Sequence, residues 1–288
     1  MDMKWSLRTA MRMLVVALLL FACLGAAALA DTLALPQGTK WIETEAFYGD
    51  TSIDRVVLGN DVMSIGTRAF ANSSLKEIDL PASLTYIADS AFSGMSKVTA
   101  TAPKGSYAYN WALDHDNVAL TGSCGTNCTW TLWQGTLTIA GTGAMKNYTD
   151  ASPFPADHVT RIVIKNGVTA IGQYAFYGLE NVTSVTIPST VTSIKNHSFD
   201  GCSSLTRVII PDDVTVLGEF AFGHCASLVS ARVPNSVTSM GNAVFYDCFA
   251  LSDVTIPNGL TVIKSSTFSG CRALESITIP DSVTSIGS

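Results

Sequence analysis

The sequence predicts a β-rich solenoid of short stacked coils, arranged in two blocks. Proline recurs every 23 residues, at Pro188, Pro211, Pro234, Pro257 and Pro280. Phenylalanine keeps the same step, at Phe176, Phe199, Phe222, Phe245 and Phe268. A period of this length indicates stacked supersecondary units, because a unit so short cannot bury an apolar face alone.

Each unit contains a short predicted strand. In the unit that begins at Phe199, the pattern Leu205-x-x-Val208-x-Ile210 places apolar residues alternately along the chain. Proline then ends the strand, because it has no N–H to donate to a neighbour. A second short run, Val214–Leu217, turns at Gly218, and the return path carries Phe222. Stacking such coils forms parallel sheets with strands roughly 4.8 Å apart and buries the phenylalanines.

These units resemble BspA-type leucine-rich repeats, as the runs LTRVIIPDDVTVLGEFAFGHC and LESITIPDSVTSIG show. The resemblance covers nearly the whole chain after residue 30 and implies right-handed leucine-rich-repeat coils. The asparagine of other leucine-rich repeats is absent, as is typical of the BspA-like class. Its usual position holds Thr190, Asp213, Ser236, Gly259 and Ser282. The resemblance implies a role in surface adhesion, and the adhesion roles of this family are diverse.

Residues 1–30 are predicted to be a signal peptide, so the chain is expected to be secreted or held at the cell surface. Lys4, Arg8 and Arg12 precede an apolar run from Met13 to Leu24, and Ala28-Leu29-Ala30 fits a cleavage site. A retained membrane anchor is an alternative for which the apolar run is short. Lipidation at Cys23 is another, because Leu20-Phe21-Ala22-Cys23 resembles a bacterial lipobox.

The charge that remains after the leader argues against two classes of partner. The leader holds three of the 17 basic residues and one of the 23 acidic ones, which leaves 14 and 22 and a net charge of −8. No basic cluster remains to neutralise a row of phosphates, so we expect no nucleic-acid partner. Anionic membrane surfaces are disfavoured for the same reason, and no membrane insertion is expected after leader removal.

Residues 31–120 are predicted to form the first repeat block. Phe47, Phe70 and Phe92 mark its coils. The pattern then gives way to a helix-prone stretch, and GSYAYNWA within it resembles a segment that closes repeat blocks in BspA-like proteins. We therefore interpret residues 103–120 as a cap that covers the last coil.

Residues 121–160 are predicted to form a β-hairpin module that caps the second block. Thr129–Trp133 and Gly135–Ile139 alternate with period two around a tight turn. The residues predicted to cover the first coil are Trp130, Leu132, Leu137 and Ile139. Residues 161–288 form the second block, which ends within a repeat. That ending predicts a strand at Ile277–Ile279 with an unpaired edge, and such an edge favours end-to-end self-association of this piece. It also predicts that the native polypeptide is longer.

The cysteines fall into a column and a pair. The column at Cys202, Cys225, Cys248 and Cys271 is predicted to fill small buried slots, because side chains spread along a line do not converge on a metal. Cys124 and Cys128 form the irregular pair. A local disulfide fits an exported protein, and free thiols are the equal alternative. Zinc would need two more ligands, and the nearest candidates, His115 and His158, have no recognisable spacing.

No motif in the chain predicts catalysis or a cofactor. The sequence contains no G-x-S-x-G elbow, no H-E-x-x-H and no glycine-rich phosphate loop. We therefore predict a protein that is not an enzyme, with no catalytic, cofactor-binding or metal-binding residues. One threonine column, Thr192, Thr215, Thr238, Thr261 and Thr284, is expected to be a solvent-facing ladder. Ice binding would need a second, matched threonine column, but the companion positions hold Ser193, Val216, Ser239, Val262 and Ser285.

The strand face of the second block is the predicted contact surface for a partner. Its outward positions are Arg207, Ile209, Ser230, Arg232, Asp253, Thr255, Glu275 and Thr278. Solenoids bind partners along such continuous faces, although a merely solvated face is the plainer interpretation. The sequence thus predicts a secreted or cell-surface binding and adhesion protein with protein or cell-surface ligands. The alternative is a non-catalytic spacer or scaffold within a longer surface protein.

Overall fold

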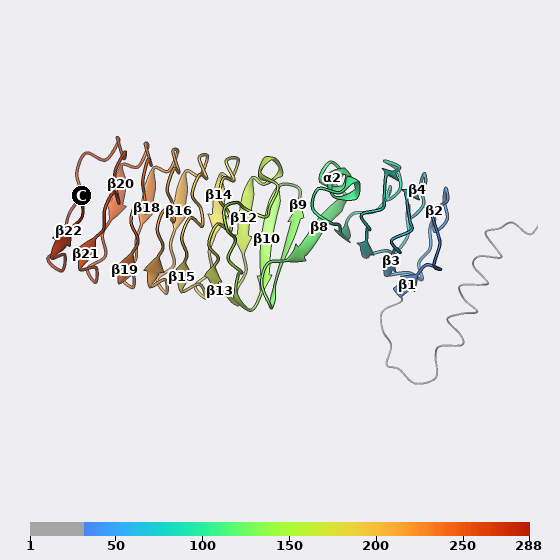
Figure 1. The fold of residues 1–288 in the computed structure, drawn as a ribbon, viewed down its shortest axis with the longest axis horizontal. Helices are drawn as coiled ribbons and strands as arrows, with labels where there is room; N and C mark the ends of the chain where they lie inside the picture. The colour runs from blue at the N-terminus through green and yellow to red at the C-terminus, as the bar shows by residue number, and fades with distance from the viewer. Residues whose placement is uncertain (1–31) are drawn as a thin grey trace, which may run out of the picture. The chain divides into compact units, whose positions relative to one another are not determined.

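The computed structural model describes residues 32–288, which divide into two compact units. The first unit extends to Leu120 and the second from Thr121 to Ser288. The predicted signal peptide and Cys23 lie outside the described residues. Figure 1 shows that each unit is a stack of coils with short strands, so the predicted β-solenoid is confirmed.

The first unit has two parallel ladders, because each coil contributes one strand to each. One ladder contains β1 (Thr32–Ala34), β3 (Arg55–Val57), β5 (Glu77–Asp79) and β7 (Val98–Thr101). The other contains β2 (Trp41–Ile42), β4 (Ser64–Ile65) and β6 (Tyr86–Ile87). Equivalent residues of successive coils are direct partners, as in the alignment of Val56 with Ile78. Each strand turns at least one apolar residue inward, and Ile65 and Val56 are fully buried.

A short helix closes the first unit. Helix α2 (Tyr107–Leu113) begins after Ser106, whose side chain accepts a hydrogen bond from the Tyr109 N–H. The helix places the Trp111 ring 5.9 Å from the Phe92 ring, at the end of the phenylalanine column. The indole thus covers the last aromatic ring, as a capping element must. After the helix, β8 (Val118–Ser123) pairs in parallel with β7.

The second unit opens with the predicted hairpin. Strands β9 (Cys128–Trp133) and β10 (Thr136–Gly141) are antiparallel. Gln134 and Gly135 connect them with φ values of 46° and 71°. Positive φ at both central residues is the geometry of the two-residue turn that matches the twist of a hairpin. Leu137 and Ile139 are buried against the next coil, since β10 pairs in parallel with β12 (Arg161–Ile164).

The coils that follow again supply two series of strands. The series that continues from β12 is β14 (Ser184–Thr186), β16 (Arg207–Ile209), β18 (Ser230–Arg232) and β20 (Asp253–Thr255). The second ladder is β11 (Gly143–Ala144), β13 (Val168–Ile171), β15 (Ser193–Ile194), β17 (Val216–Leu217) and β19 (Ser239–Met240). Strands β21 (Val262–Ile263) and β22 (Ser285–Ile286) form a separate pair. A 3₁₀ turn at Ala156–His158 precedes β12.

The prediction of a strand at Ile277–Ile279 is wrong. This segment belongs to no strand in the structure, although β22 of the same coil is paired. Ile277 is half-buried and Ile279 is exposed, whereas Val208 and Ile210 at the equivalent positions are buried. Because Ile277 and Ile279 bury less apolar surface than Val208 and Ile210, their segment lacks the packing that stabilises β16 as a strand.

Stacked phenylalanine rings form the core of each unit. In the second unit the ring of Phe222 lies 5.3 Å from that of Phe199 and 5.8 Å from that of Phe245. Phe222 is fully buried, which confirms its predicted interior position. The column begins one coil earlier than the sequence predicts, at Phe154, whose ring lies 5.9 Å from that of Phe176. Trp130 packs edge-on against Phe154 and so covers the start of the column.

Candidate functional site

Six of the eight predicted contact residues lie together on the outward face of β16, β18 and β20. The register places Arg207, Ser230 and Asp253 in one row. Ile209, Arg232 and Thr255 form the second row. The residues between the rows face inward, and Val208 and Ala231 are buried. A ladder of backbone hydrogen bonds thus holds both rows in place, and we call these six residues the strand face.

The other two predicted residues lie outside this ladder. Glu275 and Thr278 are exposed, but their segment belongs to no strand. The sequence could not show this, because their repeat has the same apolar pattern as its neighbours.

Charge on the strand face is largely uncompensated. The Arg232 guanidinium lies 3.6 Å from the Asp212 carboxylate, and both side chains are mainly exposed. Arg207 takes part in no ion pair within residues 32–288. Between the two arginines Ile209 is 60% exposed. The face thus combines an apolar side chain with two accessible cations.

The equivalent face of the first unit is different, because its charges pair with one another. Arg55 lies 3.3 Å from Glu77 and 2.8 Å from Asp79. Lys76 lies 2.9 Å from Asp54. Such exposed pairs add little stability, but they occupy the charges that a partner would otherwise contact. Among the described residues, this face of the second unit therefore leaves more charge unpaired than that of the first unit.

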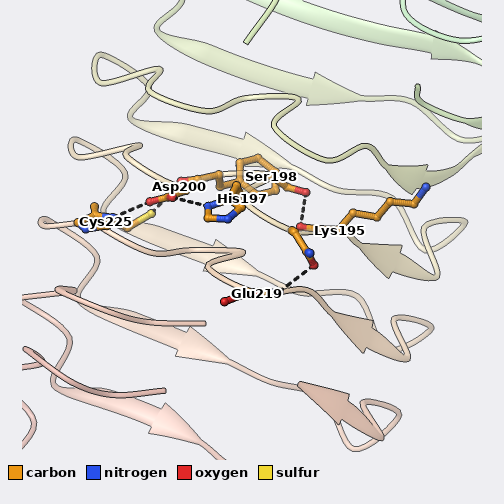
Figure 2. A network of polar contacts seen from close by, with 9 residues as sticks. Lys195, His197, Ser198, Asp200, Glu219 and Cys225 are labelled. Atoms are coloured by element: carbon orange, nitrogen blue, oxygen red, sulfur yellow. Dashed lines mark hydrogen bonds and ion pairs between the residues drawn. The ribbon is translucent and has the colours of Figure 1, made fainter. Parts of the chain in front are cut away.

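A buried carboxylate between two histidines is a feature that sequence reasoning missed. Asp200 is only 4% exposed, and its two oxygens lie 2.7 Å from His197 Nδ1 and 2.6 Å from His224 Nδ1. Figure 2 shows the Asp200 and His197 side chains turned toward each other between neighbouring coils. An imidazole Nδ1–H donates to each oxygen, which compensates the buried charge.

Aromatic rings pack against both histidines of this histidine–aspartate cluster. The His197 ring stacks between Tyr174, at 4.6 Å, and Phe220, at 5.1 Å. The two histidines are one coil plus four residues apart, so the repeat register could have indicated their proximity. Within residues 32–288 no group of three or more histidine, cysteine or acidic side chains is arranged to hold a metal. The contacts seen here tie adjacent coils together.

The column of cysteines has the structural role that its spacing predicts. Each thiol donates to the carbonyl of a phenylalanine in the preceding coil, as Cys202 Sγ does to Phe176 at 3.3 Å and Cys248 Sγ to Phe222 at 3.1 Å. Burial raises the pKa of the Cys202, Cys225 and Cys248 thiols, and that of Cys271 to about 11. These sulfurs therefore stay protonated at neutral pH and are poor nucleophiles.

Hydroxyl groups also bond adjacent coils. At the position where other leucine-rich repeats have asparagine, Thr190 Oγ1 donates to the Val168 carbonyl at 2.8 Å and Ser236 Oγ to Val214 at 2.6 Å. In the exposed threonine column, Thr215 Oγ1 donates to the Thr192 carbonyl at 3.2 Å. These hydroxyls serve the stacking of coils, which is a structural reason for both columns.

The irregular cysteine pair closes a loop at the entrance to the hairpin. Cys124 and Cys128 are both buried and are free thiols in the structure. The Cys124 N–H donates to the Cys128 carbonyl at 2.9 Å. This bond holds the backbones of the two cysteines close together, as a disulfide between them requires. A disulfide here stays a prediction.

We expect oxidised glutathione to convert this pair to a disulfide: the two thiols lose two protons and two electrons, and the disulfide of the reagent is reduced to two glutathione thiols. Burial raises the pKa of Cys124 to about 12. Because the thiolate is the attacking species, the reaction should be slow at neutral pH and faster as pH rises. Peptide mass spectrometry measures the product, with Cys202 as the internal control. A pair that stays reduced under native oxidising conditions at raised pH would contradict the prediction.

The described residues contain no helix long and apolar enough to cross a membrane. A shallow pocket in the first unit brings no ionisable cluster together. Its lining residues are Leu35, Pro36, Gln37, Gly38, Thr39, Gly59, Asn60 and Asp61.

Comparison with solved structures finds leucine-rich-repeat proteins from several bacteria. A leucine-rich repeat protein from Bacteroides ovatus is 25% identical with a TM-score of 0.51, over 88% of this chain and 77% of that protein. A leucine rich cell surface protein from Faecalibacterium prausnitzii is 27% identical with a TM-score of 0.43, over 86% of this chain and 59% of that protein. The T. pallidum Leucine Rich Repeat protein is 29% identical with a TM-score of 0.45, over 53% of this chain and 78% of that protein.

No curated protein is significantly similar to the chain. The family signature described as a BspA type Leucine rich repeat region matches six copies, over residues 27–108 and 169–288. These ranges contain most of the stacked coils of both units. The chain therefore belongs to the BspA-type leucine-rich-repeat family.

Proposed function

We propose that this chain is a secreted or cell-surface adhesion protein whose strand face binds a protein on another cell. The observation that carries the proposal is the exposed Ile209 between Arg207 and Arg232 on a rigid ladder. Arginine and large apolar side chains contribute much of the binding energy in protein interfaces. Because the ladder already holds them in place, little conformational entropy is lost on binding.

The distribution of charge supports a protein partner with its own polarity. Arg207 and Arg232 lie on β16 and β18, whereas Asp253 lies on β20 at the other side of the face. A partner with an acidic patch opposite the arginines would be oriented by this gradient. Export rests on the predicted leader, residues 1–30.

Binding to intact epithelial cells, measured by flow cytometry with fluorescently labelled protein, tests this function. We expect the double variant Ile209→Ser, Arg232→Ala to bind at least about tenfold more weakly, because truncation of one hot-spot side chain costs about 2 kcal/mol. The matched control is Thr192→Ser, Thr215→Ser, at the residues that directly precede β15 and β17 of the other ladder, which should bind like the unmodified protein.

Equal binding of the two double variants would refute the assignment of the strand face. No cell binding by the unmodified protein would instead favour the spacer or scaffold role, in which the coils only display other parts of a longer surface protein.

A further inference from the structure

We propose a second binding surface, on the first unit, that takes a proline-rich peptide in the polyproline II conformation. The surface lies over β2, β4, β6 and the start of α2, and we call it the aromatic face. Its members are the exposed side chains Trp41, Met63, Tyr86 and Tyr107. Trp41 is 60% exposed and Tyr86 54% exposed, so both rings are largely available to a ligand.

The ladder sets the spacing of the aromatic face. Trp41 pairs with Ser64, and Ser64 pairs with Tyr86. With strands roughly 4.8 Å apart, the backbone positions of the two aromatic residues are about 9.6 Å from each other. The small Ser64 leaves the space between them open. Ile42, Ile65 and Ile87, the inward partners on the same strands, are buried and fix these positions.

Tyr107 extends the row by one step. Its hydroxyl accepts a hydrogen bond from the Ile87 N–H at 3.2 Å, which ties the capping helix to β6. The side chain is still 40% exposed. A ligand that lies across the strands would therefore meet Trp41, the gap at Ser64, Tyr86 and then Tyr107.

The fold does not require aromatic residues here. In the second unit the same column holds Ser193, Val216, Ser239, Val262 and Ser285, and its ladder forms without an aromatic ring. Serine and valine satisfy the geometry of an outward ladder position. Tryptophan and tyrosine at this column of the first unit therefore call for an explanation other than stability.

The size of the aromatic face favours a narrow ligand. An aromatic side chain has roughly 150–250 Å² of surface, so the exposed parts of Trp41, Tyr86 and Tyr107 amount to about 300 Å². A stable protein interface covers about 800 Å² on each partner. Strands β2, β4 and β6 are only two residues long and the second residue of each is buried, so the face is narrow at each rung. An extended peptide fits this shape better than a globular protein does.

Polyproline II geometry matches the spacing. This helix has three residues per turn and rises about 3.1 Å per residue, so equivalent prolines recur about every 9.3 Å. That is close to the separation of Trp41 and Tyr86. The helix has no internal hydrogen bonds, so its carbonyls can accept from the indole N–H and the tyrosine O–H. Recognition of such segments by aromatic side chains is an established binding mode.

Fluorescence polarisation with a labelled decaproline peptide tests the proposal on the protein containing residues 32–288. The unmodified protein should bind decaproline, and a glycine–serine peptide of equal length should not bind. Trp41→Ala should weaken binding at least about tenfold, and Ser64→Phe, which fills the gap between the aromatic residues, should do the same. Trp41→Phe keeps a ring and should bind within a few-fold of the unmodified protein.

The matched control is Val216→Ala in the second unit, which should leave peptide binding unchanged. Because Trp41 is exposed, its substitution should preserve the circular dichroism spectrum, and Tyr86→Ala provides an independent loss of ring surface if Trp41→Ala does not fold. The proposal is overturned if decaproline does not bind at millimolar concentration, or if Trp41→Ala and Tyr86→Ala bind it as tightly as the unmodified protein. Binding of a linear glucan oligosaccharide in place of decaproline would also overturn it and assign the face to glycans.

Discussion

Replacing Phe222 by alanine is expected to destabilise the second unit by about 3 to 5 kcal/mol. The ring is fully buried and stacks on Phe199 and Phe245. Its removal loses the transfer free energy of the ring and leaves a cavity that the neighbouring coils cannot fill. Coils stacked in one dimension depend on their neighbours, so the loss weakens contacts on both sides.

Urea unfolding followed by hydrogen exchange of second-unit peptides measures this change. Phe249→Ala is the matched control, because that ring is exposed and its described aromatic contact is with the Arg272 guanidinium, at 4.7 Å. The control should change stability by less than about 1 kcal/mol. A loss of less than about 1 kcal/mol for Phe222→Ala would show that the phenylalanine column does not stabilise the unit.

Proline at Val208 is expected to unfold the second unit and leave the first intact. Val208 lies at the centre of β16, where it is buried and pairs with Ala231. Proline removes an N–H from the ladder and replaces a packed side chain, at a cost of about 3 kcal/mol or more. The two units have separate phenylalanine columns, each covered by its own tryptophan, so we expect each to unfold cooperatively by itself.

Val56→Pro on β3 is the reciprocal control, since Val56 has the same buried position in the first unit. It should expose the amides of residues 32–120 to hydrogen exchange and spare those of the second unit. A single transition in which both units lose protection together, for either variant, would refute the prediction of two independent blocks.

The elements predicted best are those that either a strong local pattern or the 23-residue repeat specifies. The hairpin around Gln134-Gly135 combines period-two alternation with a turn that suits glycine. The buried Phe222 follows from the 23-residue step alone. Phe154 was missed because the prolines on either side of it suggest a turn and its distance to Phe176 is 22 residues, so it falls out of register.

The backbone conformation of the return path of each coil is a feature that local sequence patterns did not predict. Tyr174, His197, Phe220, Ala243 and Ser266 occupy one column and all have φ between 48° and 58°. Such φ values are uncommon for bulky residues. The structure maintains them because each N–H in this column donates to the next coil, as His197 does to the Glu219 carbonyl at 2.8 Å. Glycine preference would not have indicated this column, since none of its members is glycine.

Sequence alone determined the solenoid, the register of its coils and the identity of the buried columns, because periodic burial of apolar residues leaves a direct trace in the chain. Tertiary structure decided the contacts between coils, which depend on how far one coil stands from the next. Gly218 is an example: a Cβ there would lie 2.4 Å from the Asn196 nitrogen of the preceding coil, so the requirement for glycine comes from close approach. The histidine–aspartate cluster and the aromatic face arise in the same way, because stacking brings together residues from different coils whose individual positions follow no common sequence motif.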